Sequence, residues 1–445
     1  MTSCDCEICK NNHSFKLSSE LLEDFQHGKI CIFAGAGIST ESKEVLNHTF
    51  YDEIASQLGY EDCSSPFPEL MEEYCSLHNG RIKLLTKIRN RFKHIDSFPE
   101  LYRSATRFHN ELSTLFPVQT IVTTNWDKYF EEECLATPFV TDQDIVFWDN
   151  LERRVLKIHG SINNYGSIVA TTNDYKKCET RLNNNLIGSV LKTILATQTI
   201  IFIGYSFNDS DFIAIWDFVT KQMGDFKRQA FVVTPFENDR RHFEDKGLIP
   251  IITDGTYFIS QVKKHFIKTQ CMLPDYIYEK AEIVLEIIYE AHELLLEEFN
   301  SQEFPQIIIA ASYQDGVIHA LERTINLRCS GEYSHLCNVQ NTVKEYEKLR
   351  KKSLTQKRYG DVAYIQGYIN GLISLLACSE EEEAFLPPPL FFAFGAKNIF
   401  DFEEYKEIIN DLPNLHKASY KHVLKVVNKL SKEDNNIVFH HRPWL

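Results

Sequence analysis

The chain has 445 residues, of which 43% are hydrophobic and 24% are charged. This length exceeds what one hydrophobic core usually serves, so the sequence predicts two domains, and the composition excludes a fibrous or wholly disordered protein. The formal net charge of −15 argues against an extended nucleic-acid-binding surface, because such surfaces are built from clustered Lys and Arg.

The start of the chain is rich in cysteine. Four potential zinc ligands that could close a tetrahedral site lie close together there, namely Cys4, Cys6, Cys9 and His13. The alternative is a terminal segment that holds no metal. The sequence has no apolar run of membrane-spanning length, and its first residues lack the basic-then-apolar layout of a secretion signal. We therefore expect a cytoplasmic protein with no membrane segment, whose 12 cysteines are mostly reduced thiols.

Short β-rich runs alternate with longer helical patterns between about residues 29 and 253. Strands are expected at 30–33, 120–123, 155–158, 199–203, 230–233 and 250–252. Helices are expected at 50–58, 69–77, 101–115, 185–196 and 209–219, and the basic stretch 81–93 is interpreted as a solvated helix face. Several strand candidates are continuous apolar runs, which is typical of strands buried on both faces. The pattern predicts an α/β fold, a Rossmann-like parallel sheet covered by helices.

After about residue 268 the sequence pattern predicts helices and few strands. Apolar stripes with helical spacing occur at 281–299, 362–377 and 420–430. We predict an all-helical C-terminal domain and place the two domains at 1–270 and 271–445. Near the end, His440 and His441 are interpreted as part of an exposed tail rather than a metal site, because adjacent histidines do not share a helix face.

Glycine or polar residues directly follow four of the expected strands. The carboxyl ends of parallel strands meet at one edge of a sheet, which is where open α/β proteins bind ligands. A Gly-x-Gly turn after the first strand would let a backbone approach a diphosphate closely, although the third glycine of the dinucleotide fingerprint is absent. The residues that follow the four strands are Gly35, Ala36, Gly37 and Ser39, then Thr124, Asn125 and Asp127, then His159, and finally Gly204 and Ser206.

This ordered set resembles the sirtuin family. The family's Gly-Ala-Gly-Ile-Ser phosphate loop is matched at 35–39 and its Thr-Gln-Asn-Ile-Asp segment at 123–127. Its His-Gly pair is matched at 159–160, and its later Gly-x-Ser at 204–206. The resemblance covers about residues 20 to 265 and implies a sirtuin-like sheet domain that binds NAD⁺.

The departures from the family pattern also carry information. Protein deacylases of the family usually hold a structural zinc with two Cys-x-x-Cys pairs after the His-Gly motif, whereas that region here has only Cys178. The Asp-Phe-Arg element after the phosphate loop is missing as well. Together these absences argue against binding of an acyl-lysine peptide. What is left is similar to the divergent sirtuin-like effectors of bacterial antiphage systems, including Asp209 and Asp211 after the Gly-x-Ser segment.

The resemblance assigns roles to individual residues. Asn125 would contact the ribose and order the attacking water, and His159 would accept a proton, which suits an imidazole with an unperturbed pKa of about 6.5. Asp127 would bind the carboxamide or fix its loop. The residues expected to bind the rest of the dinucleotide are Gly35, Ala36, Gly37, Ser39 and Thr124, with Gly204 and Ser206 closing the other side.

The function expected from this resemblance is NAD⁺ glycohydrolysis, which depletes cellular NAD⁺ during abortive infection. Two alternatives stay open: a non-catalytic NAD or nucleotide sensor that controls a partner, and a protein deacylase. The helical domain is expected to mediate oligomerisation or partner docking, so a homo-oligomer is anticipated. At the family level the resemblance points to a HerA-type hexameric ATPase as partner; an Argonaute partner or a standalone role is also open.

Overall fold

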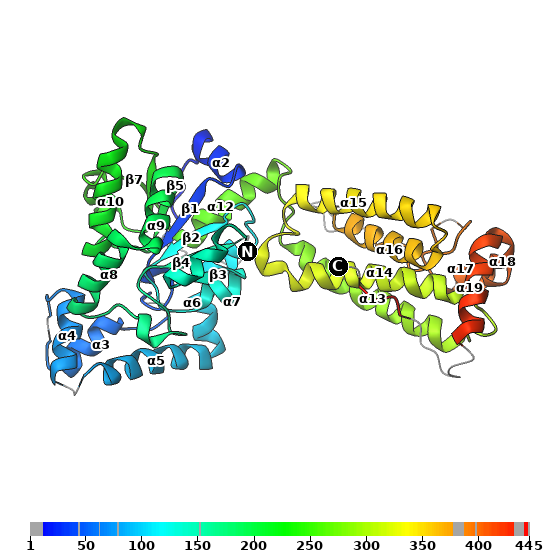
Figure 1. The fold of residues 1–445 in the computed structure, drawn as a ribbon, viewed down its shortest axis with the longest axis horizontal. Helices are drawn as coiled ribbons and strands as arrows, with labels where there is room; N and C mark the ends of the chain where they lie inside the picture. The colour runs from blue at the N-terminus through cyan, green and yellow to red at the C-terminus, as the bar shows by residue number, and fades with distance from the viewer. Residues whose placement is uncertain are drawn as a thin grey trace. The chain divides into compact units, whose positions relative to one another are not determined.

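A computed structural model describes residues 12–443, apart from 43–44, 62, 78–79, 151–152, 377–386, 397 and 431–439. The chain forms two compact units, Met1–His265 and Phe266–Leu445. The first is an α/β unit and the second is helical (Figure 1). Within the described residues, no helix combines the length and the apolar character needed to cross a membrane.

The first unit is built on a seven-stranded sheet with the order β3-β4-β2-β1-β5-β6-β7, in which every pair of neighbours is parallel (Figure 1). The expected fold class, a parallel α/β sheet followed by a helical region, is therefore confirmed. Six strands lie where the sequence predicted them: β1 (Ile30–Ala34), β2 (Thr120–Thr123), β4 (Arg154–Lys157), β5 (Thr199–Ile203), β6 (Ala230–Thr234) and β7 (Ile249–Ile252).

The sequence did not predict β3 (Thr137–Phe139). This strand has three residues and contains Pro138, and it lies at one edge of the sheet, paired only with β4. Proline cannot donate to a ladder and is tolerated in edge strands. A run this short and interrupted by proline carries no strand signal of its own.

Helices cover both faces of the sheet. On one face, side chains of α8 (Thr172–Asn184), α9 (Leu186–Thr197) and α10 (Ser210–Met223) form a core with alternate strand residues such as Phe33 and Phe202. On the other face, α12 (Gly255–Lys268) begins against Ile203 of β5 and Phe108 of α6. The remaining helices of this unit are α2 (Ser19–Gln26), α3 (Phe50–Gln57), α4 (Phe67–Leu77), α5 (Arg81–Ser97), α6 (Pro99–Ser113), α7 (Tyr129–Cys134) and α11 (Arg240–Glu244).

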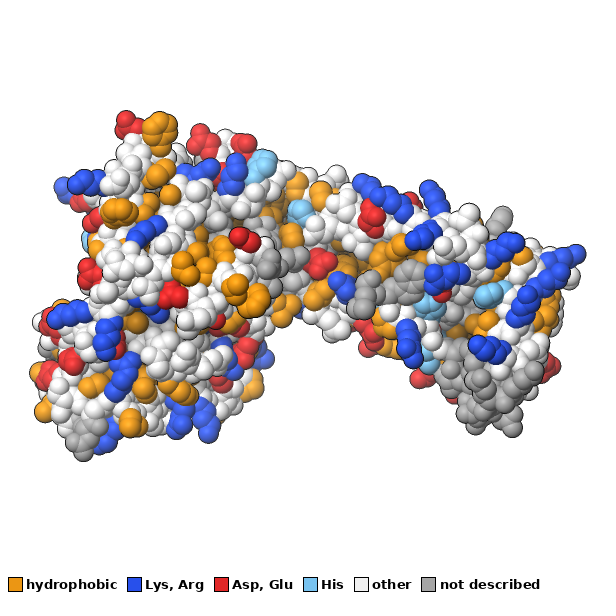
Figure 2. Space-filling model, in the orientation of Figure 1, with side chains coloured by type: hydrophobic (Ala, Val, Ile, Leu, Met, Phe, Trp, Pro, Cys, Tyr) orange, Lys and Arg blue, Asp and Glu red, His pale blue; other side chains and the backbone are white. Residues whose placement is uncertain are grey.

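The basic stretch 81–93 forms most of α5, but it is not simply a solvated face. Arg91 is buried, and its Nη2 donates to the backbone oxygens of Thr40 at 3.1 Å and His48 at 2.9 Å. Its guanidinium also lies 3.3 Å from the Glu41 carboxylate. Arg91 thus fixes the loop that follows the glycine turn, a role that helical spacing alone cannot reveal. On the visible face of the first unit, Lys and Arg are mixed with Asp and Glu rather than gathered in one patch (Figure 2).

The second unit has one main core between four long helices, α13 (Tyr276–Glu298), α14 (Ile307–Asn326), α15 (Leu336–Thr355) and α16 (Tyr359–Leu376). The backbones of α14 and α16 approach each other closely. A Cβ on Gly316 would lie 2.0 Å from the backbone oxygen of Tyr364, and a Cβ on Gly367 would lie 1.9 Å from the backbone oxygen of Tyr313. A smaller cluster joins α13 and α14 to α17 (Phe402–Ile408). The last helices are α18 (Leu412–Leu415) and α19 (Lys417–Leu430).

Candidate active site

The four segments singled out in the sequence lie at the carboxyl edge of four adjacent strands. Strands β4, β2, β1 and β5 are consecutive in the sheet. Their last residues are level with one another, since Ala34 is the Cα partner of both Thr123 and Ile203, and Thr123 is the partner of Lys157. Adjacent strands are about 4.8 Å apart, so the row from β4 to β5 spans about 14 Å, the scale of a dinucleotide. The topology therefore brings the predicted site residues to one edge.

The glycine turn after β1 packs directly on the turn after β5. Gly35 N donates to the Ile203 oxygen at 3.0 Å, and Gly37 N donates to the Gly204 oxygen at 3.1 Å. A Cβ on Gly35 would lie 2.4 Å from the Gly204 oxygen, so only glycine permits this approach. The amides of Gly35 and Gly37 are thus engaged within the protein. The residues after Gly35 form a single 3₁₀ turn, η1 (Ala36–Ile38), and α3 starts only at Phe50.

The side chain of Asn125 is oriented by its neighbours and leaves one atom without a partner. Its Nδ2 donates to the Gly35 oxygen at 3.2 Å and lies 3.4 Å from Ser39 Oγ. Its backbone N–H is held by Thr123 Oγ1 at 3.0 Å. The residue is only 4% exposed, and Oδ1 is buried with no hydrogen-bond partner among the residues that the structure describes. A buried acceptor without a partner is costly, so this oxygen is poised to accept from a bound hydroxyl or water.

Asp127 ties the loop after β2 to the glycine turn. Its Oδ2 accepts from Ser39 Oγ at 3.1 Å, and its Oδ1 accepts from Tyr129 N at 3.3 Å. Burial raises the pKa of Asp127, and the charge of Lys157 opposes that rise. The buried Lys157 donates to the Asp127 backbone oxygen and forms an ion pair with Glu131 at 2.9 Å. These contacts support the loop-fixing role considered for Asp127.

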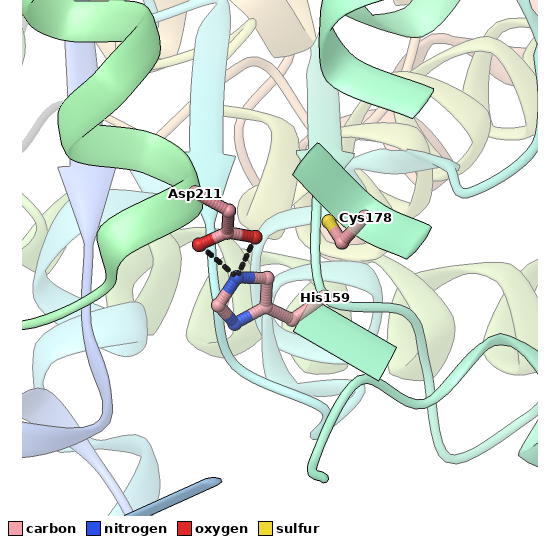
Figure 3. Close-up of side chains that lie close together, drawn as sticks. All are labelled: His159, Cys178 and Asp211. Atoms are coloured by element: carbon pink, nitrogen blue, oxygen red, sulfur yellow. Dashed lines mark hydrogen bonds and ion pairs between the residues drawn. The ribbon is translucent and has the colours of Figure 1, made fainter. Parts of the chain in front are cut away.

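His159 follows β4 and is linked to the first turn of α10. Its Nε2 lies 3.0 Å from Asp211 Oδ2 and 3.3 Å from Oδ1, as Figure 3 shows. Both residues are buried, with 3% and 1% of their surfaces exposed. In the sheet, β2 and β1 lie between β4 and β5. Because Asp211 belongs to the segment after β5, this contact joins the segments that follow β4 and β5.

The contact with Asp211 determines where the imidazole carries its proton. A carboxylate can only accept, so Nε2 holds the hydrogen in the neutral ring, and Nδ1 keeps the lone pair. Nδ1 has no hydrogen-bond partner in the part of the chain that the structure describes. Burial lowers the pKa of His159, but the charge and hydrogen bond of Asp211 outweigh it, so the net pKa is raised. The arrangement is that of a general base held in one tautomer.

Sequence reasoning noted Asp211 and Asp209 as part of the family segment but gave neither a role. Asp209 accepts from the Tyr175 hydroxyl at 2.8 Å, and the Tyr175 ring lies 5.1 Å from that of His159 in an edge-on arrangement. Nothing in the spacing of these residues, on three different elements, could have predicted the contacts. The sequence indicated a role for Asp209 and Asp211 only in that these two carboxylates follow Gly204 at the expected edge of the sheet.

The other predicted binding residues lie nearer to the surface. Ser206 and Gly37 are exposed, and Ala36, Thr124 and Gly204 are partly exposed. Thr124 donates its backbone N–H to the Ala34 oxygen at 3.4 Å. These five residues, which we call the binding rim, follow β1, β2 and β5 at the same sheet edge as the buried Asn125 and His159.

The helices inserted between β1 and β2 pack over this edge of the sheet. Phe50 of α3, Leu70 of α4 and Ile88 of α5 share a core with Ile168 and Ala170, which follow His159 in the chain. Trp126, next to Asn125, packs against the same core. The segments that carry Asn125 and His159 are therefore packed against the helices inserted between β1 and β2.

Metal binding was considered for two groups of residues. The first is the N-terminal set, of which Cys4, Cys6 and Cys9 lie outside the described residues, while His13 is exposed. The second comprises His159, Asp211 and Cys178, whose potential ligand atoms lie within 4.8 Å of one another (Figure 3). Burial raises the pKa of the Cys178 thiol, which therefore stays protonated, and Asp211 already holds His159. A metal would have to displace the proton of this thiol and the hydrogen bond between His159 and Asp211, so we assign no metal to this second group.

Comparison with known proteins gives an independent view of the first unit. Residues 119–251 match the family model described as a SIR2-like domain. The chain is 25% identical to defense-associated sirtuin 2 of Bacillus subtilis over 285 residues, which are 61% of this chain and 28% of that protein. It is 29% identical to the NAD(+) hydrolase ThsA of Enterococcus faecium over 194 residues, 42% of this chain and 39% of that protein.

A second ThsA, from Cytobacillus dafuensis, is 28% identical over 231 residues, which are 51% of this chain and 45% of that protein. The matches thus span less than half the length of each of these relatives. The chain contains a SIR2-like domain and is distantly homologous to defence-associated sirtuins and NAD(+) hydrolases.

Proposed function

We propose that the first unit hydrolyses the nicotinamide–ribose bond of NAD⁺ and thereby depletes NAD⁺ during antiphage defence. The observation that carries this proposal is that one sheet edge holds two chemical groups. One is Asn125 Oδ1, a buried acceptor without a partner among the described residues, and the other is the imidazole of His159, whose proton Asp211 holds on Nε2 so that Nδ1 keeps its lone pair. Both residues stand at the same sheet edge as the glycine turn. The distant homology to proteins named NAD(+) hydrolases supports the choice of substrate.

The chemistry requires little beyond these groups. Nicotinamide leaves with the electron pair of the C1′–N bond, and positive charge develops on the ribose. Asn125 Oδ1 accepts a hydrogen bond from a ribose hydroxyl or from water and so positions it. Water attacks C1′ and gives up a proton, which Nδ1 of His159 accepts, and Asp211 stabilises the resulting imidazolium. The partly exposed rim, with Ala36, Thr124 and Ser206, would hold the rest of the dinucleotide.

The direct test is product analysis with the purified full chain and NAD⁺. We expect nicotinamide and free ADP-ribose from the wild type. Asn125→Ala and His159→Ala should each lower turnover by about 10²-fold or more, the usual contribution of such groups, with an unchanged circular dichroism spectrum. The exposed His27→Ala serves as a control that should keep full activity. Wild-type turnover in either site variant would remove that residue from the mechanism.

The same experiment separates the competing functions. Unchanged NAD⁺ with measurable binding would support a nucleotide sensor, and acyl-ADP-ribose formed from an acylated peptide would support a deacylase. For the second unit we propose oligomerisation or partner docking, with a HerA-type ATPase as the partner to test first. Sedimentation as a strict monomer, together with activity that the ATPase does not alter, would contradict this assignment.

A further inference from the structure

The second unit gathers histidines and carboxylates where the C-terminal residues 440–443 meet the long helices. His292 comes from α13, Asp315 from α14, and His440 from the C-terminal segment. One potential ligand atom of each lies within 4.8 Å of the other two. Histidine side chains are visible on the surface of this unit (Figure 2). None of these residues belongs to the proposed active site.

The tautomer of His292 follows from a chain of hydrogen bonds. Gln314 Nε2 donates to the Leu390 oxygen at 3.1 Å, so the other amide atom of Gln314, Oε1, faces His292 as an acceptor. His292 Nδ1 lies 3.0 Å from this Oε1 and must therefore carry the hydrogen. The lone pair of the neutral ring is then on Nε2. Within the described ranges of the chain, Nε2 is buried without a hydrogen-bond partner, in a residue that is only 7% exposed.

Asp315 connects this nitrogen to the C-terminal segment. Its carboxylate is buried and accepts from His440 Nδ1 at 3.1 Å and from the backbone N–H of His441 at 2.6 Å. The rings of His292 and His440 lie face to face with centroids 5.2 Å apart. Metal binding would require the hydrogen that His440 Nδ1 donates to Asp315 to leave that nitrogen. Because 56% of the His440 side chain is exposed, water can supply a proton to Nε2 instead, and Nδ1 can then bind the metal.

The neighbouring His441 holds the segment in place independently. Its Nε2 lies 3.1 Å from Asp361 Oδ1, and its ring stacks on Tyr364 with centroids 4.1 Å apart. The sequence predicted an exposed tail here. His440 and Arg442 are indeed exposed, but both histidines of the segment are anchored to the helices.

We propose that His292, Asp315 and His440 form a binding site for a divalent metal ion of the zinc class, which clamps the C-terminal segment onto α13 and α14. Two imidazoles and one carboxylate are a donor set that suits Zn²⁺, with a fourth position for water. Gln314 supports the first of these ligands, as carbonyl groups that accept from metal-bound histidines commonly do. The proposal explains why a buried imidazole nitrogen faces a carboxylate without a partner of its own.

The test uses the full chain with Cys4→Ser, Cys6→Ser and Cys9→Ser, so that the N-terminal cysteines cannot contribute. After removal of metal with a chelator, this protein is titrated with Zn²⁺ and, in parallel, with Co²⁺. We expect one equivalent to bind, with cobalt bands in the visible range and no intense thiolate-to-cobalt absorption, because the ligands are nitrogen and oxygen. A cobalt spectrum dominated by thiolate would contradict the proposal.

Point variants show whether the bound metal is at the proposed site. His292→Ala and Asp315→Asn should lose the equivalent, and Gln314→Met should bind it about 10- to 100-fold more weakly. The matched control is His319→Gln. His319 lies on α14, as Asp315 does, but its Nδ1 is 3.1 Å from the Tyr364 hydroxyl, so this variant should bind Zn²⁺ as tightly as the parent does. Circular dichroism confirms that each variant is folded. Equal Zn²⁺ binding by a folded His292→Ala variant and its parent, or no binding by the parent, would overturn the proposal.

Discussion

Replacing Asp211 by Asn tests the proposed mechanism at the point where the structure is most specific. Phe212 N donates to Asp211 Oδ1 at 2.9 Å, so the oxygen of an asparagine would stay on that side. Its Nδ2 would take the place of Oδ2, which lies 3.0 Å from His159 Nε2. An amide nitrogen donates, so Nε2 would have to accept, and the imidazole proton would move to Nδ1. The free base would then be lost while the shape of the site is kept.

The expected loss follows from the contribution of a positioned general base. That contribution is about 10²- to 10⁴-fold in rate, equivalent to about 3 to 5 kcal/mol of transition-state stabilisation. We expect kcat/KM for NAD⁺ to fall by this factor in Asp211→Asn. KM should change much less than kcat, because Asp211 does not belong to the binding rim.

The pH profile gives a second readout that a purely structural role would not alter. The base works only when His159 is neutral, so activity falls as the pH drops through its pKa. In the wild type, burial lowers this pKa, but Asp211 outweighs burial and raises it. Without that charge the pKa falls, and the residual activity of Asp211→Asn should persist to lower pH than wild-type activity does.

The assay is the initial rate of nicotinamide release across the pH range, with folding checked by circular dichroism. Asp209→Asn is the matched control: this carboxylate lies in the same loop but binds the Tyr175 hydroxyl, and its effect on the pKa of His159 ranks below that of Asp211. Its rate and acid limb should stay close to those of the wild type. If Asp211→Asn keeps the wild-type kcat/KM and acid limb, the assignment of His159 as an oriented base is wrong.

Three further predictions concern stability and are checked by denaturant unfolding. A side chain on a residue with left-handed backbone costs ~1–2 kcal/mol. Gly204→Ala should destabilise the protein by more than this, because φ of Gly204 is +63° and the new Cβ would also lie 2.6 Å from the backbone nitrogen of Ile38. Gly224→Ala should show only the backbone cost, because φ of Gly224 is +49° but the space around it is open. Lys157→Met should cost about 3–5 kcal/mol, because it would leave the Glu131 carboxylate, which is only 14% exposed, without its counter-charge. Adding Glu131→Gln should recover part of the loss, and no recovery would argue against this ion pair as the cause. Gly316→Ala should destabilise the helical unit by ~1–3 kcal/mol or more, as overpacking does, because its Cβ would lie 2.0 Å from the facing backbone of α16, and an unchanged midpoint would refute the close packing.

The fold class was predictable because it depends on local patterns. The run from Ile30 to Phe33 is apolar throughout, as is typical of a strand buried on both faces, and several of the other predicted strands are largely apolar as well. Once all strands are parallel, residues that follow them must meet at one edge, so the common location of Asn125, His159 and Gly35 also followed from the order of segments. The short edge strand with Pro138 escaped prediction because it lacks that pattern.

The state of each chemical group was not predictable. The glycine turn was expected to let its backbone approach a diphosphate closely, but the amides of Gly35 and Gly37 bond to the backbone oxygens of Ile203 and Gly204. Arg91 was expected to be solvated, yet it is buried and holds a loop. His440 was expected in an exposed tail, yet it bonds to Asp315, which lies 125 positions earlier in the chain.

The sequence by itself determined the parallel sheet, the helical second half and the edge at which chemistry is expected, because periodicity and strand order are properties of neighbouring residues. Only the tertiary structure decided that Asp211 orients His159, that Asn125 Oδ1 finds no partner in the described part of the chain, and that His292 faces a carboxylate. These contacts join residues from different helices, strands and loops. Their distances depend on how whole elements pack, and no local pattern encodes that packing.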